Sequence, residues 1–473
     1  MNKTSEVIKV KEKKLNLFLL ITLIVGTIIG GGIFNSPTDL ILKANPMVSL
    51  IGWLIGGLGI LALALVFYKL TMVRPNLNGG IYSYAKAGFG EYIGFNSFWG
   101  YWLGAIFGNI AFISLFFKTL NSLLATPLTS MECFIGGSVL LWLYTFISWH
   151  GVHNASVLNA IITIAKVIPL VLVVIVGIAL FQPHIFNVSQ WTTTLASTHQ
   201  HVSFTEQIGQ AMSTIVWCFV GIEAAVSMSR RAKKPGEVGI ATIVSFIIVW
   251  LLYALVSLLP MGIVSAHELS VSSVPLATVL EKSVIGHAGS LIIKFGLLIS
   301  LLGALLSWFM IGPEIAYVTS MDHALPRVFS LVNRHGVPGV SLLVYTVIMQ
   351  AILVVLLLPK LQTAYTVAYT LATITTLVSY LLSALYGFKV AVKETKDWEF
   401  TLVAAIASLY AIYTIFSTGI TYAFASLIIF ALGIPVYLLS HSEMNRYEKL
   451  LAWIIGISGV LALIMILHGG LNF

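Results

Sequence analysis

The amino-acid sequence predicts an all-α polytopic membrane protein, on the basis of its composition, its long apolar runs and the placement of its charges. Hydrophobic residues make up 58% of the 473 residues, charged residues only 9%, and the mean hydropathy is +0.98. A soluble protein of this length needs far more charge to cover its surface. Most of the surface must therefore lie in the lipid bilayer, and we predict a single membrane domain over residues 1–473.

Successive apolar runs account for most of the chain and predict the individual membrane spans. A bilayer core about 30 Å thick takes roughly 20 apolar residues per helix. The ten-residue alternating segments of a membrane β-barrel are absent. We therefore expect about 12–13 transmembrane helices, over residues 16–43, 47–70, 97–122, 132–149, 155–180, 207–229, 239–263, 289–318, 340–358, 364–388, 400–418, 420–440 and 450–468.

The basic residues predict the orientation of these spans. A net charge of +8 could suggest a nucleic-acid partner, but most Lys and Arg residues fall in alternate short loops, and the long loop at about 181–204 has none. Because loops rich in Lys and Arg stay in the cytoplasm, we expect a cytoplasmic N-terminus, a multi-pass protein of the cell membrane and no nucleic-acid partner. No small-residue cleavage site follows the first apolar run, so we predict a first span rather than a signal peptide.

The sequence contains no pattern typical of a metal, cofactor or catalytic site. Cys133 and Cys218 both lie in apolar segments and support neither a disulfide framework nor a metal site. The eleven histidines form no ligand-spaced pair on a helix face. A phosphate-binding loop is absent, which argues against an ATP-driven pump. We therefore predict no enzyme activity, no cofactor and no metal.

A run of three glycines interrupts the first span. Gly30, Gly31 and Gly32 lie midway along it, and Pro37 follows. Each glycine weakens a helix interior by roughly 1 kcal/mol relative to alanine, and irregular backbone at membrane depth occurs only where protein or a wet cavity surrounds it. The run predicts a broken helix whose free amides bind a carboxylate. Close packing of helices through small residues is the alternative.

Glu223, Glu314 and Lys166 are embedded within predicted spans, where a charge is costly and is by default a functional hypothesis. Glu223 lies seven residues before Arg230, roughly 10 Å into the sixth span. Glu314, in the eighth span, lies nearer the inner end. Lys166 precedes Pro169 in the fifth span and must face protein, where it could replace a bound metal cation or exchange a proton. A structural partner for each acid, and a lysine that reaches toward water, are the alternatives.

Tyr101, Trp217 and Trp308 also lie within spans rather than in the interfacial belts where aromatic residues gather. An aromatic face near the middle of the membrane can close over a substrate and attract a cationic group. Simple packing is the alternative for each residue. Together with the glycine break and the embedded charges, these aromatic residues favour a binding site for a small organic solute.

Several motifs give the sequence a resemblance to the amino acid–polyamine–organocation transporters. They are GTIIGGGIFN at 26–35, NGGIYSYA at 78–85, YWL at 101–103, GN at 108–109, WCFVGIE at 217–223 and SW at 307–308. The match runs from about residue 14 to 440. Within this superfamily the chain is similar to the basic amino acid/polyamine antiporters of the arginine–ornithine and lysine type.

The resemblance implies a five-plus-five inverted repeat. Spans 1–5 would form the first repeat at 15–180 and spans 6–10 the second at 207–388, with accessory spans 11–13 at 400–468. Spans 1 and 6 would both be broken at the middle of the membrane. The first break agrees with the glycine run found independently.

The resemblance also implies which residues surround the substrate. Those that match are Thr27, Ile28, Gly30, Gly31, Gly32, Tyr101, Gly104, Ala105, Asn109, Trp217, Cys218 and Trp308. The residues of span 1 would bind the carboxylate and amine, and those of span 3 would face the side chain. Trp217 would act as a gate and Trp308 would stack on the side chain. Glu223 would be the proton-sensing or gating carboxyl, and Lys166 would occupy the place where sodium-coupled relatives hold an ion.

The sequence departs from the family pattern at three points. Gly31 replaces a serine of the arginine–agmatine relatives, and Glu314 replaces a neutral polar residue. The predicted span at 450–468 exceeds the usual twelve, which would place the C-terminus outside. An additional embedded acid fits a cationic substrate.

These patterns favour exchange of a basic amino acid, such as arginine, ornithine or lysine, for a related amino acid or its decarboxylated amine. A proton-coupled symporter, or a histidine/histamine-type exchanger, of the same fold is an alternative, and a channel or nutrient sensor is an alternative of another class. Breaks in the middle of the membrane and occluding aromatic residues favour alternating access over an open pore. The implied partners are the substrate and the lipid bilayer, with a homodimer left open.

Overall fold

The computed structural model describes residues 16–468 apart from 78, 152–154, 188–193, 224, 225, 227–232, 359 and 441–443. The basic segment at 3–14, Asn78 of the family motif, and Arg230 and Arg231 lie outside the described residues. The side chains of 155–160, 235 and 420 are likewise outside this description.

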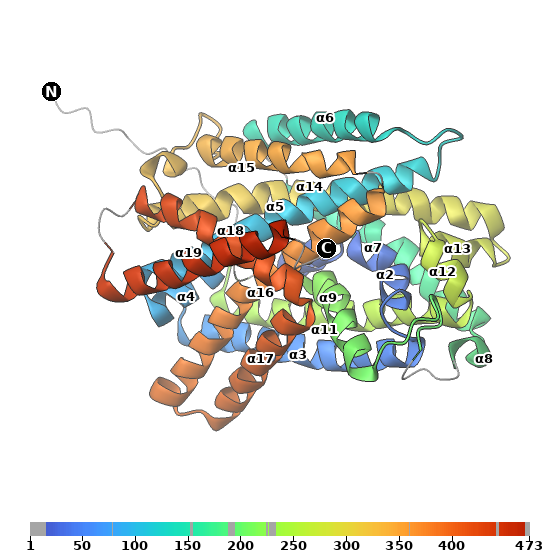
Figure 1. The fold of residues 1–473 in the computed structure, drawn as a ribbon, viewed down its shortest axis with the longest axis horizontal. Coiled ribbons are helices and arrows are strands. Elements are labelled where there is room, and N and C mark those ends of the chain that lie inside the picture. The colour runs from blue at the N-terminus through green and yellow to red at the C-terminus, as the bar shows by residue number, and fades with distance from the viewer. Residues whose placement is uncertain are drawn as a thin grey trace.

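The described residues are almost entirely helical, as predicted (Figure 1). Within this part of the chain the only β-structure is a pair of isolated bridges, Thr194 with His201 and Val332 with Pro338. The helices are α1 (Leu17–Ile28), α2 (Gly32–Ile41), α3 (Pro46–Val73), α4 (Ile81–Phe89), α5 (Glu91–Asn121), α6 (Ser130–Trp149), α7 (Ala155–Leu180), α8 (Pro183–Phe186), α9 (Phe204–Phe219), α11 (Pro235–Leu258), η2 (Leu259–Gly262), α12 (Ala266–Val271), α13 (Pro275–Glu281), α14 (Gly286–Met321), η3 (Arg327–Ser330), α15 (Gly339–Ile352), η4 (Leu353–Leu357), α16 (Leu361–Val390), η5 (Ala391–Thr395), α17 (Trp398–Ser417), α18 (Ile420–Leu438) and α19 (Arg446–Leu467).

The predicted membrane spans are present as helices. Within the described residues, eleven helices are long and apolar enough to cross a membrane, and the bent pair α1–α2 makes a twelfth. α9 has 16 residues, and half of the predicted remainder of the sixth span lies outside the described residues. The apolar run predicted at 450–468 forms α19. The chain is therefore an all-α polytopic membrane protein.

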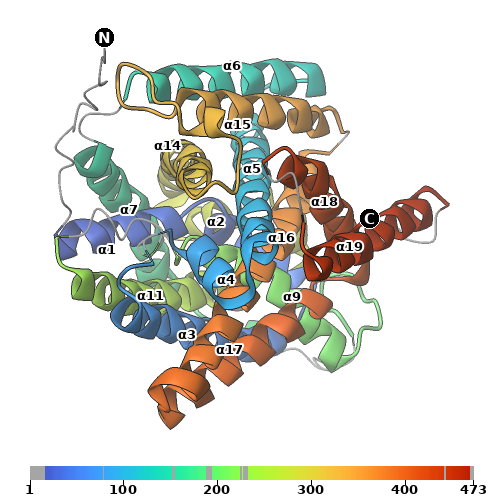
Figure 2. The ribbon, with the colours of Figure 1, turned by 90° about the vertical axis from the view of Figure 1, so that its left-hand side faces the viewer.

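The helices divide into a buried centre and a lipid-facing periphery. α5 packs most extensively against α16 and also contacts α14, and 83% of its apolar window is buried. In both views α6 and α15 lie side by side at one edge, and α17 lies beside α3 at the opposite edge (Figures 1 and 2). α19 pairs with α18 and has only 17% of its window buried, so its apolar residues face lipid.

The glycine run breaks the first span where predicted. α1 ends at Ile28, Ile29 takes a non-helical conformation, and α2 starts at Gly32 after a bend of 40°. Carbonyl groups freed by the break are satisfied by other helices. The Tyr253 hydroxyl donates to Ile28 O at 2.9 Å, and the Ser300 hydroxyl donates to Gly30 O at 3.1 Å. The break is therefore stable because protein, not lipid, surrounds it.

The outer half of the sixth span ends opposite this break. α9 stops at Phe219, and Gly221 follows with φ +111°, a conformation that side chains strongly disfavour. A Cβ atom on Gly221 would lie 3.1 Å from the carbonyl carbon and oxygen of Thr27. Two independent features therefore require glycine at position 221, the positive φ angle and the close approach of α1.

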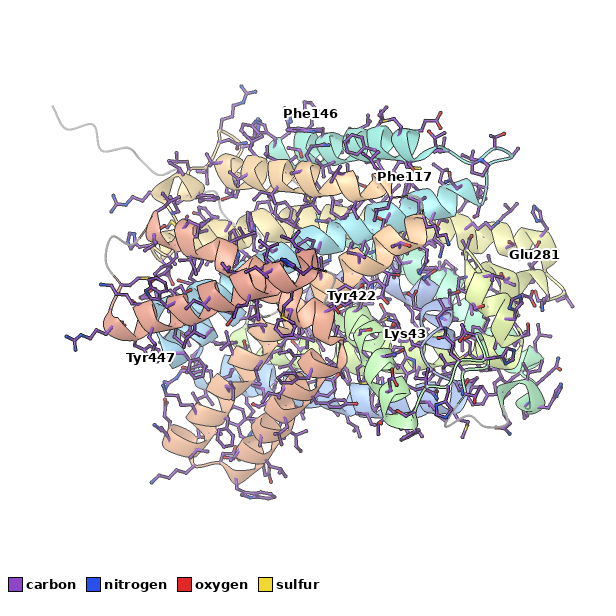
Figure 3. All side chains as sticks on the ribbon, viewed as in Figure 1. Lys43, Phe117, Phe146, Glu281, Tyr422 and Tyr447 are labelled. Carbon is purple, nitrogen blue, oxygen red and sulfur yellow. The ribbon has the colours of Figure 1, made fainter. Side chains whose placement is uncertain are left out.

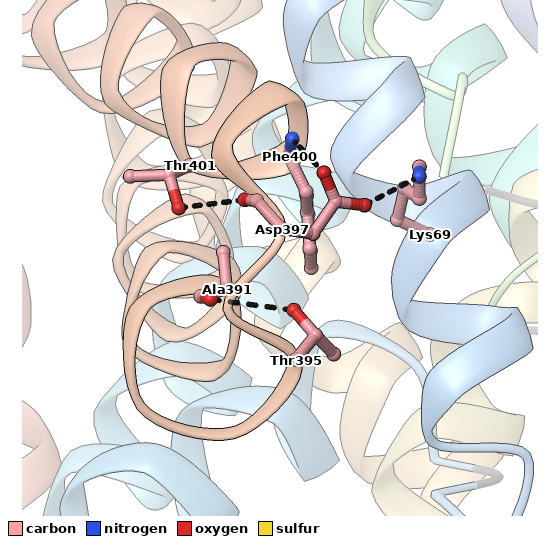
Figure 4. A network of polar contacts seen from close by, with 6 residues as sticks. All are labelled: Lys69, Ala391, Thr395, Asp397, Phe400 and Thr401. Atoms are coloured by element: carbon pink, nitrogen blue, oxygen red, sulfur yellow. Dashed lines mark hydrogen bonds and ion pairs between the residues drawn. The ribbon is translucent and has the colours of Figure 1, made fainter.

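On the inner side, polar contacts join the end of α3 to the start of α17 (Figure 4). The Lys69 ammonium contacts the Asp397 carboxylate at 2.9 Å, and that carboxylate also accepts from the Phe400 amide at 3.0 Å. These contacts hold the pKa of Asp397 below its ordinary value, with the hydrogen bond from Lys69 as the largest cause. Arg74 pairs with Glu394 nearby. Since all four charged side chains are about a third exposed or more, water screens these pairs and their contribution to stability is small.

Candidate functional site

A small cavity lies at the junction of the two helix breaks. Its wall is formed by the unwound segment of the first span, the middle of α5, the end of α9 and the middle of α14. The lining residues are Ile28, Gly30, Gly32, Gly104, Ala105, Gly108, Phe112, Trp217, Cys218, Val220 and Trp308. The structure therefore brings together, around one cavity, residues from four spans that sequence motifs singled out separately.

Aromatic side chains form opposite parts of this wall. The Trp217 ring lies 5.6 Å from the Phe112 ring and stacks on Tyr369 at 5.8 Å. The Trp308 ring lies 6.0 Å from that of Tyr101. Trp217 and Trp308 are buried, at 5% and 4% exposed. A solute in the cavity would therefore lie against aromatic faces, which attract cationic groups.

The three glycines have different surroundings. A Cβ atom on Gly30 would lie 2.8 Å from the Phe112 ring, and one on Gly32 would lie 2.7 Å from Trp217 Nε1. Both positions line the cavity. Gly31 does not, because its Cβ position points at the side chains of Leu115 and Leu301. A side chain at Gly31 would therefore pack between α5 and α14, and a contact of Gly31 with the substrate stays a prediction.

The start of α2 faces the same region. No side chain caps its N-terminus, which begins at Gly31 and Gly32. The first amides of a helix have no acceptor within the helix, and the helix dipole makes this end attractive to anions. The cavity therefore offers two chemically distinct surfaces, amides that suit a carboxylate and aromatic faces that suit a cation.

Lys166 binds backbone carbonyl groups next to the break in the first span. Its side chain is fully buried, and its ammonium donates to Gly26 O at 2.8 Å and to Ile29 O at 3.0 Å. These are carbonyl groups at the C-terminal end of α1, where a positive charge is favourable. Lys166 does not line the cavity. It holds two carbonyl oxygens, and the replacement of a metal cation by Lys166 stays a prediction.

Glu223 lies beyond the cavity toward the inner side. It is fully buried and accepts hydrogen bonds from the Tyr101 hydroxyl at 2.5 Å, from the Tyr380 hydroxyl and from the Gly221 amide at 3.2 Å. These contacts join the broken sixth span to α5 and α16. Because Tyr101 also packs on Trp308, a change in the hydrogen bonding of Glu223 can be transmitted to the cavity wall.

We expect Glu223→Gln to flatten the pH dependence of transport between pH 5.5 and 8 and to change turnover, with little shift in substrate affinity. Glutamine keeps the size, with one oxygen that accepts from one tyrosine hydroxyl and an amino group that can donate to the other, but it cannot titrate. Initial transport rates and equilibrium binding across this pH range measure the two effects separately. Glu268→Gln is the matched control, since Glu268 pairs with Lys282 in an exposed position. Loss of binding with an unchanged pH profile would make Glu223 a direct substrate contact instead.

Several other predicted residues lie near the cavity without lining it. The Thr27 hydroxyl donates to Leu23 O at 2.5 Å within α1. The Asn109 amide donates to the Tyr345 hydroxyl at 2.9 Å, which directs it between α5 and α15. Glu314 is half-buried on α14, beyond the cavity wall. Ile28, Gly104, Ala105 and Cys218 do line the cavity.

Sequence reasoning missed three residues of this region. Phe112 and Val220 form part of the wall, and Tyr380 binds Glu223. Phe112 follows Gly108 by one helical turn and therefore lies on the same face of α5, a signal that could have identified it. Tyr380 carries no such local signal, because only the packing of α16 on α5 brings it to Glu223. In the part of the chain that the structure describes, no group of three or more His, Cys, Asp or Glu side chains could hold a metal ion.

Comparison with known proteins covers nearly the whole chain. The amino acid permease family matches residues 15–460. An arginine/ornithine antiporter of Pseudomonas aeruginosa is 36% identical over 450 residues, which cover 92% of each chain. An arginine/agmatine antiporter of Chlamydia felis is 34% identical over 439 residues, 90% of each chain. An arginine/ornithine antiporter of Lactococcus lactis is 34% identical over 475 residues, 95% of this chain and 89% of the relative.

The family match and the helical architecture agree. The matched range contains the broken first span, the cavity and both tryptophans of its wall. A permease family also agrees with eleven or more apolar helices in a multi-pass protein of the cell membrane. This chain belongs to the amino acid permease family.

Proposed function

We propose that this protein is a secondary antiporter that exchanges basic amino acids across the cell membrane by alternating access, without enzyme activity. The observation that carries the proposal is the cavity between two broken spans, with uncapped amides at Gly31 and Gly32 and aromatic faces at Trp217 and Trp308. These surfaces complement the carboxylate and the cationic side chain of a basic amino acid. Relatives named arginine/ornithine and arginine/agmatine antiporters support the same substrate class.

Within this proposal each part of the site has a role. The amides at the start of α2, with Ile28 and Gly30, bind the substrate carboxylate and amine. Gly104 and Ala105 leave room for the side chain. Trp217 closes the outer side of the cavity, and Glu223 with its two tyrosines closes the inner side. Residues 15–180 and 207–388 form the two inverted repeats, so that both broken spans meet at the cavity.

Counterflow in proteoliposomes tests the proposal. Vesicles that contain the purified protein are loaded with unlabelled ornithine, and the uptake of labelled arginine is followed without an ion gradient. An exchanger takes up arginine only when ornithine is present inside. Uptake that requires a proton gradient and not internal substrate would identify a symporter, and uptake without stimulation by internal substrate would identify a channel. Either result would contradict antiport.

Trp308 should contribute to binding through its aromatic face. A cation over a tryptophan ring is stabilised by roughly 0.5–2 kcal/mol, depending on desolvation. We therefore expect Trp308→Leu to weaken equilibrium binding of arginine, ornithine and lysine by about two- to thirtyfold, whereas Trp308→Phe should largely preserve binding. Equal losses in the two variants would show that the volume of the indole matters and its interaction with a cation does not.

A further inference from the structure

A group of charged and polar side chains lies between the cavity and the outer surface, with two of its members buried and three half-buried. It consists of Asn35, Asp39, Lys43, Lys118 and Gln362, which we call the outer charge cluster. They come from the outer ends of α2, α5 and α16 and from the turn after α2. Asp39 is only 2% exposed. Nothing in the proposed transport cycle so far uses these residues.

Two carboxamides connect the acid to one of the lysines. Asp39 Oδ1 accepts hydrogen bonds from Asn35 Nδ2 at 2.7 Å and from Gln362 Nε2 at 3.1 Å. The Lys118 ammonium donates to Asn35 Oδ1 at 2.9 Å and to Gln362 Oε1 at 2.6 Å. The carboxamides thus lie between the opposite charges and orient both.

The second lysine, Lys43, has a hydrogen-bond acceptor for each of its ammonium protons. The Lys43 ammonium donates to the hydroxyls of Tyr369 at 2.7 Å, Ser213 at 2.9 Å and Thr214 at 3.1 Å, so each of its three protons has an acceptor. Figure 3 shows Lys43 between α2 and α9, the helix that carries two of these acceptors. Its charge is therefore held in place by neutral groups.

The cluster retains one donor and one acceptor. Within the described residues, the Lys118 ammonium has acceptors for two of its three protons. Asp39 Oδ2 is buried and has no hydrogen-bond partner there. A buried unpaired acceptor costs about 1–3 kcal/mol. The cluster can therefore bind a molecule that carries both an anionic group, for the remaining Lys118 proton, and a hydrogen-bond donor, for Asp39 Oδ2.

The cluster is linked to the outer side of the cavity through Tyr369 and α5. Tyr369, which binds the Lys43 ammonium, stacks on the cavity residue Trp217. Lys118 follows the cavity residue Phe112 by six residues on α5, which is roughly 9 Å along the helix axis. The cluster therefore lies next to the aromatic wall, on its outer side.

Two ammonium groups and one carboxylate leave the outer charge cluster with an excess positive charge in a buried setting. This excess attracts a carboxylate and repels a decarboxylated amine, which carries positive charge alone. We propose that the outer charge cluster selects external substrates that carry an α-carboxylate, with Lys118 binding the carboxylate and Asp39 the α-ammonium group as the outer pathway opens. The inference rests on the proposed antiport function and narrows its external substrate class to amino acids.

Right-side-out membrane vesicles that contain the full chain and are loaded with ornithine test this selection. Labelled arginine is added outside, and external agmatine is the competitor. We expect Lys118→Met to raise the half-saturating arginine concentration by at least about fivefold, the effect of one charge pair about 4 Å apart even in bulk water, and to leave agmatine inhibition unchanged or stronger. Asp39→Asn should increase the preference for arginine over agmatine, because it should weaken inhibition by agmatine more than it weakens uptake of arginine.

Lys294→Met is the matched control, because Lys294 is also an outer lysine but binds only the Ser122 carbonyl among the contacts described, at 3.1 Å. It should leave the preference unchanged. If Lys118→Met and Asp39→Asn each lower the apparent affinities for arginine and agmatine by equal factors, the cluster is structural and the proposed selection is overturned. If the wild-type protein exchanges no basic amino acid at all, the proposed function itself fails. Opposite shifts in preference cannot arise from a general loss of folded protein.

Discussion

Gly32→Leu should reduce arginine counterflow by up to about a hundredfold, while the protein still inserts into the membrane. A Cβ atom at this position would already lie 2.7 Å from Trp217 Nε1, so a leucine side chain must displace the indole or fill the cavity. Overpacking of a close-packed interior costs about 1–3 kcal/mol, and about 2.7 kcal/mol corresponds to a hundredfold. Counterflow in proteoliposomes, normalised to folded protein by size-exclusion chromatography, measures the loss.

Two other glycines make the test specific. Gly456, on the lipid-facing α19, would have its Cβ atom 3.5 Å from Ile434, an ordinary contact, and Gly456→Leu should retain transport. Gly31→Leu should instead lower thermal stability, because its side chain would press on Leu115 and Leu301 rather than enter the cavity. Transport near the wild-type rate by a well-folded Gly32→Leu protein would refute the assignment of this cavity to substrate.

Lys166→Ala should also lower exchange by about a hundredfold in sodium-free buffer. The substitution leaves Gly26 O and Ile29 O without the ammonium that binds them. Each unpaired buried acceptor costs about 1–3 kcal/mol, so the loss of two loosens the break that forms one wall of the cavity. Exchange is measured in sodium-containing and sodium-free buffers for both proteins. Exchange by the wild-type protein should not depend on sodium, because the Lys166 ammonium supplies the positive charge.

An outcome in which sodium restores Lys166→Ala would strengthen the interpretation that the ammonium replaces a metal cation. Lys282→Ala is the control, because Lys282 pairs with Glu268 on the outer surface and should leave exchange unchanged. Full activity of Lys166→Ala without sodium would instead show that the break is held by Tyr253 and Ser300 alone.

Much of the architecture could be predicted from local pattern. Apolar runs of about 20 residues can satisfy their backbone in lipid only as helices, so the spans followed from composition. The break at Gly30–Gly32 followed from the low helix propensity of glycine. Glu223 and Lys166 were identified by the cost of a charge at their depth. Each of these inferences needs only a short window of sequence.

The partners of those residues could not be predicted in this way. Tyr380 reaches Glu223 from α16, and Asn109 turns to Tyr345 on α15 rather than to the cavity. Sequence pattern placed Gly31 with its two neighbours, but its orientation depends on how α5 and α14 pack against the break. Side-chain direction around an irregular segment has no period, so a motif does not reveal which glycine faces a cavity.

The outer charge cluster shows the same division. The sequence by itself places Lys43 and Lys118 near the ends of the apolar runs 16–43 and 97–122. Only the tertiary structure decided that these lysines are drawn inward beside Asp39 and joined through Gln362, a residue far away in the chain. The physical reason is that hydropathy reports the depth of a residue in the membrane, whereas the direction it faces and the partner it finds are set by the packing of helices distant in sequence.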